Sequence, residues 1–492
     1  MKRRPIKHIP LSDAGRFLRI KNLLVCLLLA LLPHAASAAL FTTSNRHFDI
    51  LPVGGPGWNP ILKVVYSVGP ISVPPNSVVD VRLQVELTND NGVPVGVGRY
   101  IVRTTNSTSV SGTTLNAPVF SNLTPEEHHG VFVAAGTERT YAQGLSNVYY
   151  SAVIYANANR SGLSLKVEPY GAPLWCATLT DLCYGGLSVE TRPAAALPGI
   201  PDPVVHEDAT LISSLPLDGA PHVLYSYGPV DVPAGSIVDA RFQTEISNEL
   251  GFEVAIGRQI IRATTPTSVT GVPVNEATMA GLSPSAWSAV LIHRGIEAAA
   301  RPLLGVYYNV IVWASSGYGG GSLVVHPGYG ELNLVFSPQP TISGLPSFAI
   351  DATENIQRGP VSFTPYCPVV LYSLGPYNIR AGVVVDISFQ AEFGNVYGHN
   401  IGVGRRVAIS DVPDGIDGSS LVQATMSDMR VWDTYIVTHS FSVLSPGWTN
   451  KYINAVVWFE PETSGTPTGE CSPRGPGVIV EQGYGHLSAQ FR

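Results

Sequence analysis

The chain has 492 residues and is acidic, with 29 Lys and Arg against 36 Asp and Glu. This balance disfavours nucleic acid and anionic membranes as partners, because both are bound through basic patches. The length exceeds what one hydrophobic core usually serves and 45% of the residues are hydrophobic, so we expect roughly two to four folded domains rather than a disordered chain.

Residues 1–38 have the features of a secretory signal peptide. A basic stretch precedes the apolar run 23–32, which is followed by Pro33 and the small-residue sequence HAASAA. A run of ten residues is too short to span a bilayer, which takes roughly 20. We predict cleavage after Ala38 and no transmembrane segment in the mature chain, with an uncleaved anchor as the alternative. Removal of seven basic and one acidic residue leaves 22 and 35, a net charge of −13. We expect the mature chain to be secreted or at the cell surface, with the periplasm as a further location.

A short phrase, Tyr-Ser-x-Gly-Pro, occurs three times, beginning at Tyr66, Tyr225 and Tyr372. In every copy an Asp follows the Tyr by 14 residues, and a Gly-Arg pair places an Arg 19 residues after that Asp. We call these the signature residues: Asp80 and Arg99, Asp239 and Arg258, and Asp386 and Arg405. Each copy closes on Tyr-Gly-x-Leu. Two spacings held three times indicate three homologous units.

The units have predicted boundaries at the Pro-rich stretches between the copies. Unit 1 covers 39–190, unit 2 covers 204–336 and unit 3 covers 347–492. The Pro-rich segments 191–203 and 337–346 are the predicted linkers.

Hydrophobic and polar residues alternate after each phrase, as in Val79, Val81 and Leu83 against Asp80 and Arg82. A period of two is typical of a strand with one buried and one solvated face. Similar segments recur between clusters of Gly, Pro, Asn and Ser, and no helical periodicity is sustained. The sequence therefore predicts an all-β protein of three tandem β-sandwiches with jelly-roll or immunoglobulin-like topology. The Gly and Pro of each phrase predict a turn that ends one strand.

The polar face of the alternating strand carries a candidate site. Asp80, Gln84 and Glu86 recur at the same positions in the other two units. Carboxylates at this spacing are able to bind a cation or to act on a glycosidic bond. We favour a structural interpretation, in which this face meets water and the signature Asp and Arg pair across neighbouring strands for roughly 0 to 1 kcal/mol. On this interpretation the protein has no catalytic residue and no cofactor.

Two further features are weaker candidates. Asp411, Asp414 and Asp417 lie in the sequence DVPDGIDG, which has the composition of a calcium-binding loop, but their spacing departs from Asp-x-Asp-x-Asp-Gly and we favour an acidic turn. Aromatic residues in the segment VYYNVIVW and its counterparts would suit stacking on sugars, although the apolarity of these segments favours core positions.

Four cysteines remain after residue 38, an even number that suggests disulfide bonds in an exported chain. Of three connectivities we favour the local one, which joins Cys176 to Cys183 and Cys367 to Cys471, because each pair then lies within one unit.

These features favour an exported, multivalent binding or adhesion-type protein whose partner is a glycan, a surface protein or another copy of the chain. A fibre or envelope component that self-assembles is the first alternative. A secreted hydrolase is the second, and its active site would lie outside the common motifs, because the sequence contains no Gly-x-Ser-x-Gly, His-Glu-x-x-His or phosphate-binding pattern.

Overall fold

The computed structural model describes most of the chain after residue 38. The described residues are 39–43, 47–57, 60–125, 129–167, 185–194, 201–202, 204–206, 211–284, 288–339, 342–346, 348–351, 368–395, 400–421, 424–430, 434–461, 478–480 and 485–492. They form strands and no helix, so this part of the chain contains no helix that could cross a membrane. The predicted signal peptide and Cys176, Cys183, Cys367 and Cys471 lie outside the described residues.

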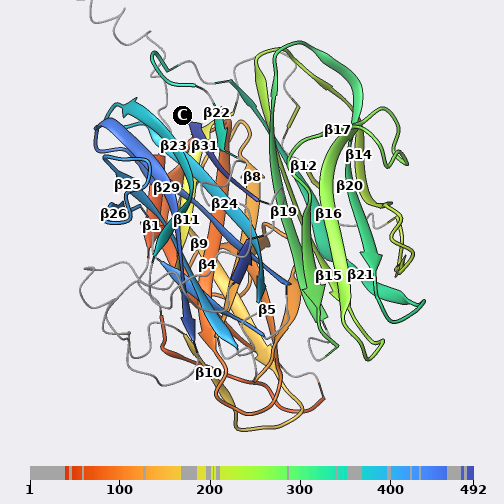
Figure 1. Ribbon diagram of the computed structural model, residues 1–492. Coiled ribbons are helices and arrows are strands. Elements are labelled where there is room, and N and C mark those ends of the chain that lie inside the picture. The colour runs from red at the N-terminus through yellow and green to blue at the C-terminus, as the bar shows by residue number, and fades with distance from the viewer. Residues whose placement is uncertain are drawn as a thin grey trace, which may run out of the picture. The chain divides into compact units, whose positions relative to one another are not determined.

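Residues 38–492 form one compact body (Figure 1). Three consecutive sets of strands, which correspond to units 1, 2 and 3, each build two sheets. The first set is β1 (Ala39–Thr43), β2 (Ile50–Pro52), β3 (Ile61–Val73), β4 (Ser77–Thr88), β5 (Val95–Thr104), β6 (Thr113–Thr114), β7 (Val119–Leu123), β8 (His129–Arg139), β9 (Leu145–Asn157), β10 (Ser164–Val167) and β11 (Gly185–Pro193). The second set is β12 (Val204–His206), β13 (Ser214–Pro216), β14 (His222–Val232), β15 (Ser236–Ser247), β16 (Val254–Ala263), β17 (Val272–Pro273), β18 (Thr278–Leu282), β19 (Ser288–Ala299), β20 (Leu303–Ser315) and β21 (Ser322–Pro338). The third set is β22 (Phe348–Asp351), β23 (Val369–Ile379), β24 (Val384–Asn395), β25 (Ile401–Ser410), β26 (Ser419–Ser420), β27 (Thr425–Met429), β28 (Thr434–Leu444), β29 (Trp448–Pro461), β30 (Val478–Val480) and β31 (His486–Phe491).

The three sets share one topology. If short neighbouring pieces such as β1 and β2, β6 and β7, or β10 and β11 are counted as one interrupted strand, each set has a first to an eighth strand in chain order. One sheet has the order first, eighth, third, sixth, and the other has the order second, seventh, fourth, fifth. Neighbouring strands are antiparallel. We call the first of these sheets the inner sheet and the second the outer sheet, and this arrangement is that of a jelly roll.

Each set of strands has its own hydrophobic core. The three main clusters of buried residues run from Leu51 to Val189, from Leu215 to Phe336 and from Leu371 to Phe491. The prediction of an all-β protein built from β-sandwiches is confirmed, with jelly-roll topology. The boundaries of the units stay a prediction, although β11 and β21 run on to Pro193 and Pro338, into the predicted linkers.

The third strand of every unit, β4, β15 or β24, is buried along its whole length. One face of β4, with Val79 and Val81, packs in the core of unit 1. The other face carries Asp80 and Arg82, which are 2% and 5% exposed. The prediction that this polar face meets water is therefore wrong, because residues of the other two units cover it.

The repeated phrase lies inside a strand and not at its end. The second strands, β3, β14 and β23, continue through it, and their register with the seventh strand shifts at the Gly-Pro pair. The predicted turn is thus wrong in position, and the phrase makes a bulge. The Gly has a positive φ, 147° at Gly69 and 149° at Gly228, which favours Gly over any other residue. Pro is tolerated because this strand lies at the edge of the outer sheet.

The Gly of each Gly-Arg pair lies beneath an aromatic ring of the seventh strand. A Cβ at Gly257 would lie 1.8 Å from the Trp313 ring, and a Cβ at Gly404 would lie 1.9 Å from the Trp458 ring. Unit 1 has the same arrangement with a Tyr ring. These aromatic residues belong to the VYYNVIVW segment and its counterparts, and Trp458 is only 6% exposed, so it has little surface for stacking on a sugar.

We expect Gly404→Ala to lower the free energy of unfolding by about 1 to 3 kcal/mol, because the added methyl group has to displace the Trp458 ring. Thermal denaturation followed by circular dichroism measures the effect. Gly317→Ala is the control, since a Cβ there has no atom within 4 Å. Equal losses in the two variants would contradict the close packing.

Candidate functional site

The three units contact one another in a cycle. The fifth strand of each unit lies against the sixth strand of the next: β7 against β19, β18 against β28, and β27 against β8. Backbone N–H groups donate to carboxylates across the same three interfaces, from Ala117 to Glu331 (2.7 Å), from Met279 to Glu392 (2.8 Å) and from His129 to Asp428 (2.8 Å). Because unit 3 contacts unit 1 through β27 and β8, these head-to-tail interfaces close into a ring.

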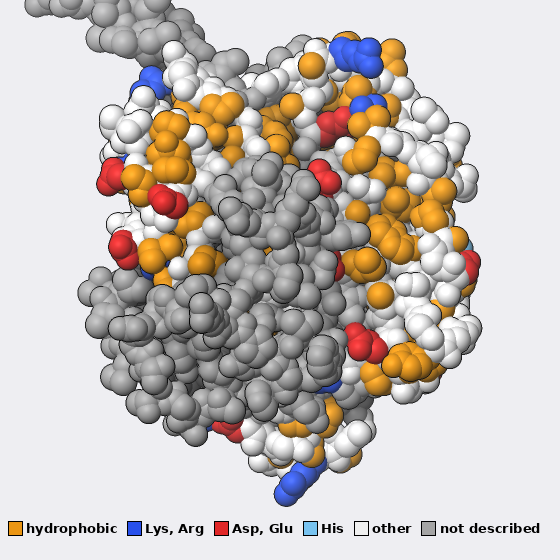
Figure 2. Space-filling model, in the orientation of Figure 1, with side chains coloured by type: hydrophobic (Ala, Val, Ile, Leu, Met, Phe, Trp, Pro, Cys, Tyr) orange, Lys and Arg blue, Asp and Glu red, His pale blue; other side chains and the backbone are white. Residues whose placement is uncertain are grey.

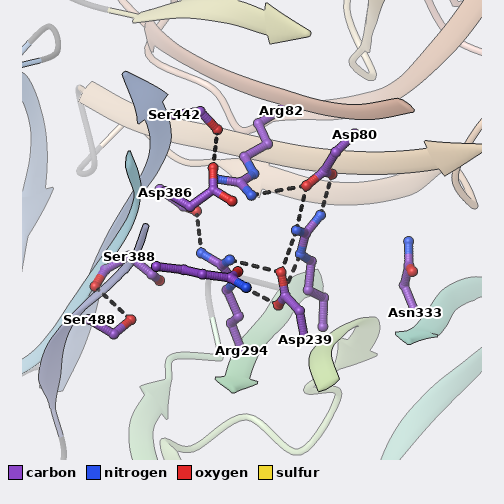
Figure 3. Close-up of polar contacts among 12 residues, drawn as sticks. Asp80, Arg82, Asp239, Arg294, Asn333, Asp386, Ser388, Ser442 and Ser488 are labelled. Carbon is purple, nitrogen blue, oxygen red and sulfur yellow. Dashed lines mark hydrogen bonds and ion pairs between the residues drawn. The ribbon is translucent and has the colours of Figure 1, made fainter. Parts of the chain in front are cut away.

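The three signature aspartates meet arginines where the inner sheets face one another (Figure 3). We call the charged residues at this place the axial cluster: Asp80, Arg82, Glu190, Arg192, Asp239, Arg241, Arg294, Asp386 and Arg492. Arg241 of unit 2 donates to both oxygens of Asp80 of unit 1 (2.5 and 2.6 Å) and to Asp239 of its own unit (2.6 Å). Arg82 pairs with Asp80 (2.9 Å) and, across the next interface, with Asp386 of unit 3 (3.2 Å).

Further arginines complete the axial cluster. Arg294 in β19 donates to both oxygens of Asp239 (2.9 and 2.8 Å) and to Ser440 Oγ of unit 3 (3.2 Å). Arg492 pairs with Asp386 (2.9 Å) and, across the interface with unit 1, with Glu190 (3.3 Å). Each aspartate therefore has two arginine partners, which offset the cost of burying its charge.

Burial and the arginines have opposite effects on the carboxyl groups. Burial alone would raise the pKa of Asp80, but Arg241 and Arg82 together hold it well below the usual value. Burial alone would also raise the pKa of Asp386, but Arg492, Arg82 and Arg294 together lower it to about 2. Burial and the neighbouring Asp386 raise the pKa of Glu190 instead. The aspartates are therefore ionised at neutral pH, which does not suit them to the general-acid role of a glycosidase.

The signature arginines do not pair with the signature aspartates. They lie on the outer sheet, on β5, β16 and β25, whereas the aspartates lie on the inner sheet. Arg99 donates from Nε to the carbonyl of Val133 (2.8 Å) and Arg258 to that of Ile292 (2.9 Å), which ties the outer sheet to the sixth strand. Arg405 donates to a serine hydroxyl on β27. The predicted pairing within each unit is wrong, because the two positions lie on opposite sheets of one sandwich.

The arginines of the axial cluster were not predicted from the sequence. A signal was present for Arg82 and Arg241, since each lies two residues after a signature aspartate on the same strand face, but unit 3 has Ser388 there. Arg294 gave no signal. The strand register places it opposite Arg241, where the other units have Ala and Ser.

A cavity of about 80 Å³ lies beside the axial cluster and is lined by residues of all three units. A cavity needs roughly 10 to 15 Å³ for one water, and an engineered cavity of roughly 150 Å³ holds benzene. The cavity therefore has room for several waters or a very small solute. It is too small for a sugar or a peptide.

The carboxylates of the acidic loop of unit 3 do not converge on one site. Asp411 is 81% exposed and pairs with Lys451 (2.6 Å), and Asp414 and Asp417 are exposed in the same turn. Asn454 holds this loop by donating to two of its carbonyls. Within the residues that the structure describes, no group of three or more His, Cys, Asp or Glu is placed to hold a metal ion.

A Ser-His pair occurs in unit 2. Ser247 Oγ lies 2.5 Å from His326 Nε2, and Glu249 lies close enough to raise the pKa of His326, although burial lowers it overall. Ser247 is 0% exposed, so its hydroxyl is not open to a substrate. The pair lacks the accessible nucleophile that a hydrolase needs.

No known protein family matches the chain, and no curated protein matches it. Among solved structures it is similar to the N-terminal CBM22-1–CBM22-2 tandem domain of Paenibacillus barcinonensis Xyn10C, with 12% identity over 61% of this chain and 92% of that chain and a TM-score of 0.17. It is also similar to infectious bursal disease virus, Gx strain (10% identity, 61% and 76%, TM-score 0.20), and to Sulfolobus Turreted Icosahedral Virus (10% identity, 86% and 92%, TM-score 0.15). TM-scores of this size carry no argument, so fold and function rest on the chain itself.

Proposed function

We propose that this protein is an exported binding protein that presents three related contact surfaces in a fixed cyclic array. Closure of the ring by three corresponding interfaces is the observation that carries the proposal. Because each inner sheet is covered by neighbouring units, the units are held at constant spacing. A partner with repeated groups, such as a glycan coat or a protein lattice, would meet three copies of one surface.

The turns between the sixth and seventh strands are the best candidates for the contact surfaces. Each exposes a large apolar side chain at or beside the turn: Tyr141 (63% exposed), Leu304 (74%) and Leu444 (49%). In every unit this turn is hydrogen-bonded to the turn before the third strand. The third strands contact neighbouring units near the aspartates and near the Gln and Glu positions. In the proposed array they run in the same direction, with the three turns at one end of the ring.

The surface composition fits an uncharged partner. On the face seen in Figure 2, hydrophobic side chains lie in several patches between uncharged polar ones, with few charged groups. Only 13% of all residues are Asp, Glu, Lys or Arg. A neutral glycan or a protein surface suits this composition better than a polyanion.

The two alternatives gain less support. A fibre built from head-to-tail contacts would need an open interface, and in this ring each unit already contacts the next. A hydrolase would need an accessible acid or nucleophile, whereas the aspartates described above are buried and paired with arginines.

We expect the combined substitutions Tyr141→Ser, Leu304→Ser and Leu444→Ser to speed dissociation from a dense ligand surface far more than any one of them does. Linked engagement of several sites raises avidity by about 10² to 10⁴ over a single site. Dissociation of the purified protein from whole cells, immobilised surface extract or a glycan array measures the effect. Tyr318→Ser is the control, because Tyr318 is 80% exposed in the turn between β20 and β21, at the other end of unit 2.

If the triple variant dissociates from the ligand surface as slowly as the parent protein, these turns are not the contact surfaces. Loss of all binding from one substitution would show a single site and contradict the array. If the parent protein binds none of these surfaces and instead polymerises with concentration, self-assembly is the better explanation.

A further inference from the structure

The cavity beside the axial cluster brings polar groups from three units to one small volume. Arg82 comes from unit 1, Arg241 and Arg294 come from unit 2, and Gln390 comes from unit 3. Three guanidinium groups thus line a space of about 80 Å³. The lining also contains one carboxylate, Glu331, which accepts hydrogen bonds from a backbone N–H and from a glutamine amide.

Several buried polar atoms of this lining have no hydrogen-bond partner among the described residues: Gln390 Nε2, Arg82 Nη1 and Asn333 Oδ1. Gln390 is 3% exposed, and its Nε2 has no hydrogen-bond partner among the described residues. The corresponding glutamine of unit 1, Gln84, donates to Thr425 Oγ1 (2.9 Å), and that of unit 2, Gln243, reaches Glu331 Oε1 (3.3 Å). A buried amide without an acceptor is costly, so the cavity favours an occupant that accepts a hydrogen bond.

The cavity lining contains three arginines and one carboxylate, Glu331, and the aspartates of the axial cluster pair with those arginines. Burial lowers the pKa of Arg294, and although Asp239 opposes this effect, Arg82 adds to it by repulsion. His293, which also lines the cavity, adds no charge at neutral pH because burial and Arg258 keep its pKa well below 6.5. An anion in the cavity would lie next to these guanidinium groups, and its charge would favour the charged form of Arg294, the one lining arginine whose pKa is lowered.

We propose that this cavity binds a small monovalent oxyanion, such as formate, acetate or nitrate, which bridges the three units and stabilises the ring. These anions are smaller than benzene, in keeping with a volume of about 80 Å³. They are planar acceptors that match both a guanidinium group and the Gln390 amide. Sulfate and larger carboxylates would not fit as well.

Thermal unfolding of the purified protein tests the proposal. We expect the unfolding midpoint to rise with formate or nitrate concentration at constant ionic strength, balanced with sodium gluconate, whose anion is too large for the cavity. At one hundred times the dissociation constant, binding to the folded state alone lowers the unfolded-to-folded ratio about 100-fold. A crystal grown with bromide should show an anomalous peak between Gln390 and Arg294.

Gln390→Leu should abolish the dependence on anion concentration, whatever its effect on basal stability. Gln84→Leu is the matched control, because Gln84 holds the corresponding position in unit 1 and does not line the cavity. It should leave the anion dependence unchanged. The proposal is overturned if the unfolding midpoint does not change with formate or nitrate concentration. It is also overturned if the midpoint of Gln390→Leu still rises with anion concentration. A bromide peak without any stabilisation means an adventitious ion only.

Discussion

Replacing Arg241 by Met should lower the free energy of unfolding by about 3 to 5 kcal/mol. Arg241 is hydrogen-bonded to the carboxylates of both Asp80 and Asp239, across the interface between units 1 and 2. Without it, two buried carboxylates face each other with one fewer cation between them. The loss is much larger than the value expected for a solvated ion pair, because water cannot replace the missing guanidinium. Calorimetric unfolding of the variant and the parent measures the difference.

Arg262→Met is the matched control for Arg241→Met. Arg262 also pairs with a carboxylate on the sixth strand, Glu297 (2.7 Å), but both side chains are partly exposed, at 22% and 15%. We expect a loss of at most about 1 kcal/mol. Adding Asp80→Asn and Asp239→Asn to the Arg241 variant should recover part of its stability. Equal losses at Arg241 and Arg262 would show that the axial cluster is not a set of buried ion pairs.

Acid should weaken the interface between units 2 and 3 before it protonates the aspartates. Burial, with a contribution from Arg294, lowers the pKa of His486 from 6.5 to about 4. A group whose pKa is lower in the folded state contributes stability above its unfolded pKa and loses it as the pH falls. We therefore expect about 3 kcal/mol of stability to disappear between pH 6.5 and pH 4. Neighbouring His293 adds to the loss, since it accepts at Nε2 from Asn275 (2.6 Å) in its neutral form.

The pH dependence of unfolding in His486→Gln isolates this effect. The variant should lose less stability than the parent between pH 6.5 and pH 4. His47→Gln, which removes a histidine at an exposed position, is the control. Glu190 works in the opposite direction, because burial raises its pKa above 4.5, so the difference between variant and parent is the decisive quantity. Parallel curves for His486→Gln and the parent would contradict the assignment.

The period-two pattern was sufficient to predict the strands but not what covers them. Val79 and Val81 identify the core face of β4, because an apolar residue at every second position has one plausible location. Asp80 and Arg82 on the other face would give the same sequence whether they met water or a second unit. The two spacings, each repeated three times, showed that the units are related. They carried no information on how the units contact one another, which depends on pairs such as Arg82 and Asp386 that lie in different units.

Some residues of the axial cluster are also not shared by the three units, so the repeat pattern does not identify them. A search for positions shared by all three units finds the aspartates and discards Arg294, which has no basic counterpart in units 1 and 3. The same comparison retains Arg99 and its counterparts, whose role is to tie two sheets within one sandwich. Positions such as Arg99 that are shared by all units therefore indicate the fold of one unit. Positions such as Arg294 that differ between units indicate the contacts between units in the axial cluster.

Closure of the ring changes what a broken peptide bond would do to this protein. Unit 1 is held to unit 3 by contacts such as Arg82 with Asp386 and Glu190 with Arg492, although these residues are about 300 positions apart in the chain. Each unit therefore has two neighbours and only one or two covalent connections. A protease that cuts between β11 and β12, or between β21 and β22, would separate fragments that still hold each other through buried ion pairs. The integrity of the folded protein then depends on its interfaces and not on an unbroken chain. For the same reason, the chain orders 1-2-3, 2-3-1 and 3-1-2 would place the units in the same cyclic arrangement, so circular permutation of the units would keep every interface.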